Sequence, residues 1–164
     1  MPQPAGQIVA RWRGELHGVD CSPLQFFERV AQAVEETGFP RIRFSEARRH
    51  EAGFFSAERI YFRIRCEQMF FDVSAFVAGR TLVIGYWLHV DQPGLFELFS
   101  EIPGVGFLFD HLLRPATYYR VDLIQSFQHA VHDSILHVID DLSDKNGIDL
   151  LPENDRHPVW NEVW

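Results

Sequence analysis

Strict alternation of side-chain character over residues 61–88, YFRIRCEQMFFDVSAFVAGRTLVIGYWL, is the strongest constraint on what this chain can fold into. Successive side chains of a β-strand point to opposite faces, so a period of two predicts strands. The break at Glu67 and Gln68 fits a two-residue hairpin loop, and VAGR at 77–80 fits a second turn. We therefore expect consecutive antiparallel strands at 60–66, 69–76 and 81–89.

The first hairpin loop also predicts which residues face one another. One face of the first two strands is apolar throughout, with the pairs Cys66–Met69, Ile64–Phe71, Phe62–Val73 and Ile60–Ala75. The other face pairs Arg65 with Phe70 and Arg63 with Asp72, and the second pair brings opposite charges together. The third strand is apolar on both sides, which predicts a central or covered position.

The outer face of this sheet carries unusual residues for a solvated surface. We expect Arg65, Phe70 and Trp87 to lie in one row, with Arg41 and Arg43 contributed by a preceding strand at 41–47. An arginine over an aromatic ring contributes about 0.5–1 kcal/mol at an exposed site. Two interpretations remain open. These side chains either pack on one another on a solvated sheet surface, or form a patch that binds a partner, because Trp and Arg often contribute much of the binding energy.

Two helices flank the predicted strands. Ser22, Pro23 and Gln25 form a helix start, and Leu24, Phe27, Val30, Ala31 and Val34 then repeat at helical spacing until Gly38 and Pro40. Residues 117–147 carry the longest helical pattern, with an apolar stripe of Ile124, Phe127, Val131, Ile135, Val138 and Leu142. Residues 7–16 are ambiguous between a helix and a strand.

The segment LFELFSEIPGVGFLFDHLL at 95–113 is rich in large apolar residues but broken by charges, Pro103, Gly104 and Gly106. These features predict two short helices around a bend. The segment either packs as a lid on the sheet or the long helix, or presents an apolar surface to a partner.

A chain of 164 residues with 46% hydrophobic residues can bury one core, so we expect a single α+β domain over 1–164. The predicted architecture is an N-terminal helix, an antiparallel meander of about four strands, short helices and one long C-terminal helix. Its core spans about 20–147, and 148–164 form a tail. The net charge of −8 disfavours nucleic acid as a partner.

No signal peptide or membrane-spanning stretch is evident, so a cytoplasmic protein without an integral membrane segment is expected. Cys21 and Cys66 are the two cysteines and have no metal-ligand spacing, which fits a reducing compartment. Cys66 shares parity with core residues. Cys21 lies near a helix N-terminus, where a thiolate is favoured, although a small apolar role is the preferred interpretation.

No catalytic, cofactor-binding or metal-binding residue is predicted. His129, Asp133 and His137 recur every four residues on one face of the long helix, but this is not a zinc-protease spacing, and we interpret the row as a solvated face. His132 lies nearer the apolar stripe and is expected to be a hydrogen-bonded boundary residue.

Three runs, FDVSAF at 71–76, TYYRVD at 117–122 and FQHAVHDSILHVIDDL at 127–142, resemble a group of uncharacterised small bacterial proteins. The order of helix, antiparallel meander and helices is also similar to the secretion-chaperone-like fold, whose small acidic members bind a client protein. It is similar as well to the ubiquitin-conjugating fold. That family places its cysteine after the meander near a His-Pro-Asn motif, whereas here no cysteine follows Cys66, so this resemblance implies an inactive, partner-binding relative.

We therefore expect a non-enzymatic protein-binding domain of chaperone, adaptor or immunity type whose partner is another protein. The alternative is a small enzyme, or an inactive relative of ubiquitin-conjugating enzymes acting in a bacterial conjugation or defence system. The predicted partner-binding residues are aromatic or cationic: Arg65, Phe70, Trp87, Phe96, Phe99, Phe107, Phe109, Trp160 and Trp164.

The tail HPVWNEVW places Trp160 and Trp164 four residues apart, on one side of a helical turn. Two exposed indoles are costly in water, so we expect them to dock on this protein or on a second copy in a homodimer. The outer row of Arg65, Phe70 and Trp87 is the expected receiver.

Overall fold

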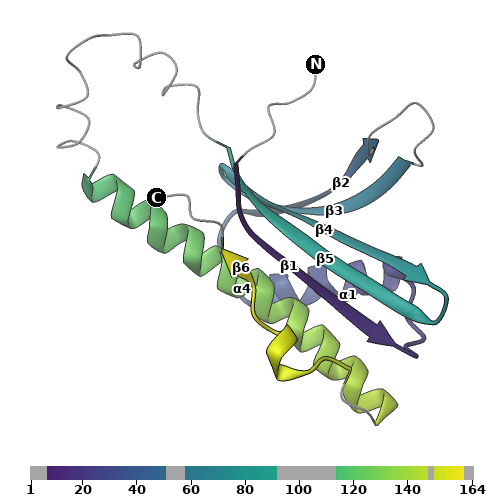
Figure 1. Ribbon diagram of the computed structural model, residues 1–164. Coiled ribbons are helices and arrows are strands. Elements are labelled where there is room, and N and C mark those ends of the chain that lie inside the picture. Colours follow the sequence, from purple (N-terminus) through teal and green to yellow (C-terminus); the bar gives the residue numbers. More distant parts are fainter. Residues whose placement is uncertain (1–6, 51–57, 92–113, 148–149, 161–164) are drawn as a thin grey trace.

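The computed structural model describes residues 7–50, 58–91, 114–147 and 150–160. Its main elements, in chain order, are β1 (Gln7–His17), α1 (Pro23–Glu36), β2 (Ile42–His50), β3 (Glu58–Cys66), β4 (Met69–Ala78), β5 (Thr81–Val90), α4 (Arg114–Asn146), the short 3₁₀ helix η1 (Glu153–Asp155) and β6 (Val159–Trp160). The fold is α+β: an antiparallel sheet with two helices against one of its faces (Figure 1).

The alternating stretch forms β3, β4 and β5, as the sequence predicts. The register is the expected one, with Ile64 opposite Phe71, Arg63 opposite Asp72 and Cys66 opposite Met69. The two-residue loop at Glu67 and Gln68 closes the first hairpin, and Glu67 adopts a positive φ of 53° there. β5 lies between β4 and β1, which confirms the central position expected from its two apolar faces.

Within the described residues the sheet has six strands in the order β2-β3-β4-β5-β1-β6, so the expectation of about four is too low. The first described element is a strand, not a helix. β1 alternates between the buried residues Trp12 and Leu16 and the exposed residues Arg11 and Arg13, and pairs antiparallel with β5. β2 continues to His50, beyond the predicted end at 47. The tail supplies the sixth strand, because Trp160 pairs with Ala10.

α1 begins as its sequence predicts. The Ser22 side chain accepts from the Gln25 backbone amide, and the Gln25 side chain accepts in return from the Ser22 amide, which completes a capping box. This arrangement satisfies amides that have no partner in the first helical turn. The helix buries Phe26, Val30 and Val34.

α4 runs for 33 residues and carries the predicted stripe into the core. Each of its six members is buried: Ile124, Phe127, Val131, Ile135, Val138 and Leu142. Phe127 packs edge-to-face on Phe71 of the sheet, at 5.2 Å between ring centroids, and against Phe39 at 5.5 Å. The helices thus cover the apolar side of β1, β5 and β4, and Cys66 lies in this core as expected.

Candidate functional site

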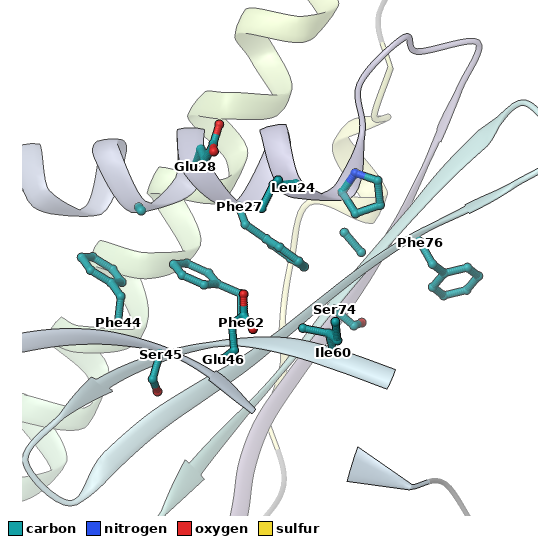
Figure 2. A pocket seen from close by; sticks show the side chains of 13 residues that line it. Leu24, Phe27, Glu28, Phe44, Ser45, Glu46, Ile60, Phe62, Ser74 and Phe76 are labelled. Carbon is teal, nitrogen blue, oxygen red and sulfur yellow. The ribbon is translucent and has the colours of Figure 1, made fainter. Parts of the chain in front are cut away.

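A groove of about 860 Å³ lies between α1 and the half of the sheet that ends at β2. Its lining comes from α1, β2, β3 and β4: Pro23, Leu24, Phe27, Glu28, Ala31, Phe44, Ser45, Glu46, Ile60, Phe62, Ser74, Ala75 and Phe76. Figure 2 shows Phe27 reaching down from α1 toward the sheet while Phe44 and Phe62 rise from the strands below it. The volume is within the range of pockets that bind ligands or side chains of a partner.

Aromatic stacking builds the floor of the groove. Phe62 stacks on Phe44 of the neighbouring strand at 5.5 Å and 9°, and on Phe27 of α1 at 5.4 Å and 24°. Phe44 lies opposite Ile64 and Phe62 lies opposite Glu46, so the two phenylalanines are diagonal neighbours on the helix side of the sheet. The three rings are only partly buried, so they remain available to further apolar contacts.

Large apolar side chains at the rim are exposed. Leu24 at the start of α1 is 63% exposed and Ile60 on β3 is 48% exposed. α1 therefore has two apolar sides: Phe26, Val30 and Val34 enter the core, whereas Leu24 and Phe27 line the groove. Clustered apolar side chains that are exposed next to a core are typical of interaction sites.

The charged residues in the lining of the groove are acidic. Among the described residues of its lining, Glu28 and Glu46 are ionisable, and none is Lys, Arg, His or Cys. In Figure 2 the Glu46 side chain lies on the helix side of the sheet, and Glu28 points from α1 away from the sheet. Most of the described lining is apolar, and its chemistry suits contact with apolar groups.

The predicted row of Arg65, Phe70 and Trp87 is on the opposite face of the sheet, but Trp87 is not beside Phe70 as expected. Phe70 lies opposite Arg65 on one side and His89 on the other, whereas Trp87 lies opposite Asp72 in the next row. Phe70 is buried, and Arg65 and Trp87 are half-buried. Their role in partner binding stays a prediction.

A cation–aromatic–carboxylate cluster occupies this outer face. Arg63 donates to both oxygens of Asp72, with Nε–Oδ1 at 2.7 Å and Nη2–Oδ2 at 3.0 Å. Its guanidinium carbon is 4.2 Å from the centroid of Phe70, and Phe70 stacks on His89 at 4.7 Å and 6°. Arg65 also lies over Phe70, at 5.3 Å, and forms an ion pair with Asp91. The expected arginine–aromatic contacts and the Arg63–Asp72 pair are therefore present.

The tail docks on the sheet, but not on the predicted receiver. Trp160 pairs with Ala10, and Ala10 belongs to the core on the helix side of the sheet, so β6 extends the edge next to β1. The expectation that Trp160 docks on the outer row is wrong, because the backbone of β1 had an open edge there. Trp164, Phe96, Phe99, Phe107 and Phe109 lie outside the described residues.

His132 was expected at the boundary of the apolar stripe and is hydrogen-bonded on both nitrogens. Nε2 lies 2.7 Å from the Arg156 carbonyl, which can only accept, so Nε2 carries the proton and Nδ1 accepts from the Tyr86 hydroxyl at 3.0 Å. Burial lowers the pKa of His132 below its ordinary value, against the opposing effect of the Arg156 carbonyl. Gln128 donates to the Tyr86 oxygen at 3.3 Å, and burial raises the pKa of Tyr86.

The row of His129, Asp133 and His137 is exposed. His137 also lines a polar hollow of about 330 Å³ between α1 and α4. Across the described ranges, no group of three His, Cys, Asp or Glu side chains is placed to hold a metal ion. Burial raises the pKa of both Cys21 and Cys66, so the thiolate that the helix terminus would favour at Cys21 is not stabilised.

Comparison with known proteins gives no relative: no family model matches the chain, and neither the curated proteins nor the solved structures contain a significant match. Within the part of the chain that the structure describes, no helix is both long and apolar enough to cross a membrane.

Sequence reasoning did not identify the groove. It placed Leu24, Phe27, Phe62 and Ile60 on apolar faces but assigned those faces to a single core. The sequence signal for the groove is an excess of apolar residues. In α1 these residues cover a wider arc than one contact with a sheet needs. On the sheet, the apolar face of β2 and β3 extends beyond the width that two helices cover.

Proposed function

We propose that this protein is a non-enzymatic protein-binding domain of chaperone, adaptor or immunity type, and that the groove between α1 and β2–β4 receives an apolar segment of its partner. The observation that carries the proposal is the open aromatic floor of Phe27, Phe44 and Phe62 beneath the exposed rim residues Leu24 and Ile60. Burial of such side chains contributes roughly 25 cal/mol per Å² of apolar surface.

The charge and chemistry of the lining support binding rather than catalysis. Its polar members are two serines and two glutamates, and both cysteines of the chain are buried elsewhere. An active conjugating enzyme would need an accessible cysteine, so no observation favours a catalytic member of that class. A cytoplasmic location remains part of the proposal.

Site-specific crosslinking tests this function. A photo-reactive amino acid replaces Ile60 at the groove rim, and in a matched control it replaces Val159, which is 54% exposed at the opposite edge of the sheet. In cells of the native host, we expect Ile60 to crosslink to a small set of proteins that Val159 does not reach. The products should disappear when Leu24→Asp is added and persist with Glu153→Ala, an exposed change near the tail.

Equal crosslinking from the two positions, or products that survive Leu24→Asp, would contradict the groove as a binding site. Folding of each variant is checked by circular dichroism and thermal melting, because Leu24 is exposed and its substitution should leave the core intact.

A further inference from the structure

The sheet divides between β3 and β4. β3 pairs with β2 along all nine of its residues, whereas its pairing with β4 ends at Phe62 and Val73. Beyond this point β4 keeps β5 as its neighbour, and Figure 1 shows β2 and β3 turning away from β4 and β5. We call the opening between residues 58–61 of β3 and 74–78 of β4 the fork.

The fork leaves backbone groups of β4 without a strand beside them. Successive residues of an antiparallel strand direct their N–H and C=O groups alternately to the two neighbouring strands. Met69 follows the two-residue loop that joins β3 to β4, so the odd-numbered residues of β4 direct these groups toward β3. The expected pair of Ala75 with Ile60 is not formed, and among the described residues Ala75 and Val77 have strand partners in β5 alone. Their N–H and C=O groups therefore face the fork.

The apolar groove reaches this fork. Ala75 of β4 and Ile60 of β3 both line it, and Figure 2 shows Ile60 on the strand side, below Phe27 of α1. The next side chain on the helix side of β4 is Val77, which is 55% exposed. Backbone hydrogen-bonding groups and exposed apolar side chains thus occur together at this end of the groove.

This combination favours an extended peptide over a purely apolar ligand. An acyl chain would cover Ile60 and Val77 but would leave the N–H and C=O groups of Ala75 and Val77 without hydrogen bonds, which is unfavourable in apolar surroundings. An added strand supplies both kinds of contact, because its backbone pairs with the sheet and its alternate side chains fill pockets.

The charge of the groove specifies the segment further. Glu28 and Glu46 are exposed in its lining, and neither forms an ion pair with a described residue. The chain as a whole carries a net charge of −8. Both the local and the overall charge attract a cationic segment and repel an acidic one.

We propose that β4 accepts, at Ala75 and Val77, an extended segment of the partner protein in which large apolar residues alternate with polar ones and Lys or Arg is present. The backbone of the segment pairs with the open side of β4, and its apolar side chains enter the groove beside Phe62. Its cationic side chains are attracted to Glu28 and Glu46. This inference rests on the proposed function and specifies the conformation and charge of the partner segment.

Synthetic peptides test the segment. The probe has about eight residues, alternates Val with Thr in equal number and carries Lys at both ends. One control has Glu in place of Lys, and the other has the same composition with the valines in one block. In fluorescence anisotropy we expect the probe to bind about tenfold or more tightly than either control, because only the probe combines one apolar face with positive charge.

Alternate N-methylation of the probe tests backbone pairing. One version is methylated on every Val amide and the other on every Thr amide, so both carry the same number of methyl groups. Because an added strand directs only one of these sets toward β4, one version should bind within about threefold of the probe and the other about tenfold or more weakly. Equal affinity of the two versions would contradict strand pairing.

Amide exchange measured by NMR locates the contact. Without peptide, the amides of Ala75 and Val77 should exchange faster than that of Ala78, which faces β5. The probe should slow exchange at Ala75 and Val77 and leave β1 unchanged. Protection without peptide that rises with protein concentration would assign the fork to a second copy, and concentration-independent protection that blocks the probe would assign it to this protein's own chain. Either result would overturn the inference.

Two double variants of equal charge change test the electrostatic contribution. Glu28→Gln with Glu46→Gln should weaken the probe about fivefold or more at low salt. Glu35→Gln with Asp144→Asn is the matched control, since both residues are exposed and lie outside the lining of the groove, and it should retain affinity within about twofold. Equal losses would show that net charge, not the groove, attracts the peptide.

Failure of the probe to bind would also overturn the inference, and decanoate that protects the groove from crosslinking while the probe fails would assign the groove to an apolar small molecule. If crosslinks from Ile60 to partner proteins depend on Leu24 while the probe fails, the proposed function stands and only strand pairing falls.

Discussion

Two buried polar side chains, His132 and Asp72, hold separate segments of the protein together, so their substitution should have clear effects on stability. His132 links the sheet, through the Tyr86 hydroxyl, to the tail, through the Arg156 carbonyl. On the outer face, Asp72 is 1% exposed and is held by Arg63. The hairpin register predicts the Arg63–Asp72 pair, whereas the partners of His132 come from β5 and the tail, which the sequence pattern does not connect to α4.

The pH dependence of stability should reveal the protonation of His132. Its pKa is lowered in the folded protein, so the unfolded chain binds more protons once the pH falls below the ordinary value of 6.5. The stabilisation is therefore complete above about pH 6.5 and is lost as the pH falls through the folded pKa. We expect His132→Gln to reduce the free energy of unfolding by about 1–3 kcal/mol at pH 8, from the loss of buried hydrogen bonds.

The measurement is urea denaturation of both proteins between pH 8 and pH 5. The stability difference should shrink toward acid, because only the wild type carries the penalty of protonating residue 132. A difference that stays constant with pH would show that His132 does not titrate in this range.

The Arg63–Asp72 pair should show strong coupling. Asp72→Leu leaves the Arg63 side chain, which is 16% exposed, without its carboxylate, and should cost about 3–5 kcal/mol of stability. Arg63→Met combined with Asp72→Leu removes both charges and should recover a large part of that loss. Chemical denaturation of the two single variants and the double variant measures the coupling. Additive losses would contradict an interaction between the two side chains.

At the scale of elements, the local signals of helices and hairpins were reliable. The capping box at Ser22, the loop at Glu67 and the apolar stripe of α4 all depend on residues within a few positions of one another. β1 was harder, because Val9, Trp12 and Leu16 also have helical spacing. Pairing with β5 decides in favour of a strand, and a register shift between Ile8 and Ala10 allows Val9 to be buried as well.

Removal of the cap should destabilise α1 and loosen the groove that starts at its first turn. Ser22→Ala should cost about 1 kcal/mol, because the Gln25 amide loses its acceptor. Ser22→Asp is the matched control, since Asp also caps helices, and it should retain most of the stability. Thermal melting measures both, and equal losses would show that the side-chain oxygen at this position does not contribute.

At the scale of the whole molecule, the tail is a strap that joins α4 to the sheet. Leu150 and Leu151 are buried, Trp12 Nε1 donates to the Asp155 carbonyl at 2.7 Å, and Arg156 forms an ion pair with Asp140 of α4. β6 then pairs with β1. The strap covers the edge and the helix-side face of β1, which would otherwise expose Trp12.

Graded truncation tests this strap. Deletion of residues 150–164 should cost roughly 3–6 kcal/mol from the two leucines alone and should increase binding of an apolar dye. Among the described residues, deletion of 158–164 removes the two-residue pairing with β1, and its loss should cost about 1 kcal/mol. Light scattering and dye fluorescence measure both truncations. Equal effects would contradict a major contribution from Leu150 and Leu151.

The sequence by itself determined the features that repeat at short range. Alternation set the register of β3 against β4 and the two faces of β5, and helical spacing set the buried face of α4, because both periods follow from backbone geometry within one element or one hairpin. The tertiary structure alone decided the placement of β1 between β5 and β6, the return of the tail to β1, and the groove between Phe27 and Phe62. Each of these features depends on which surface remains uncovered after distant segments have packed. The periodicity of a single element does not predict that surface.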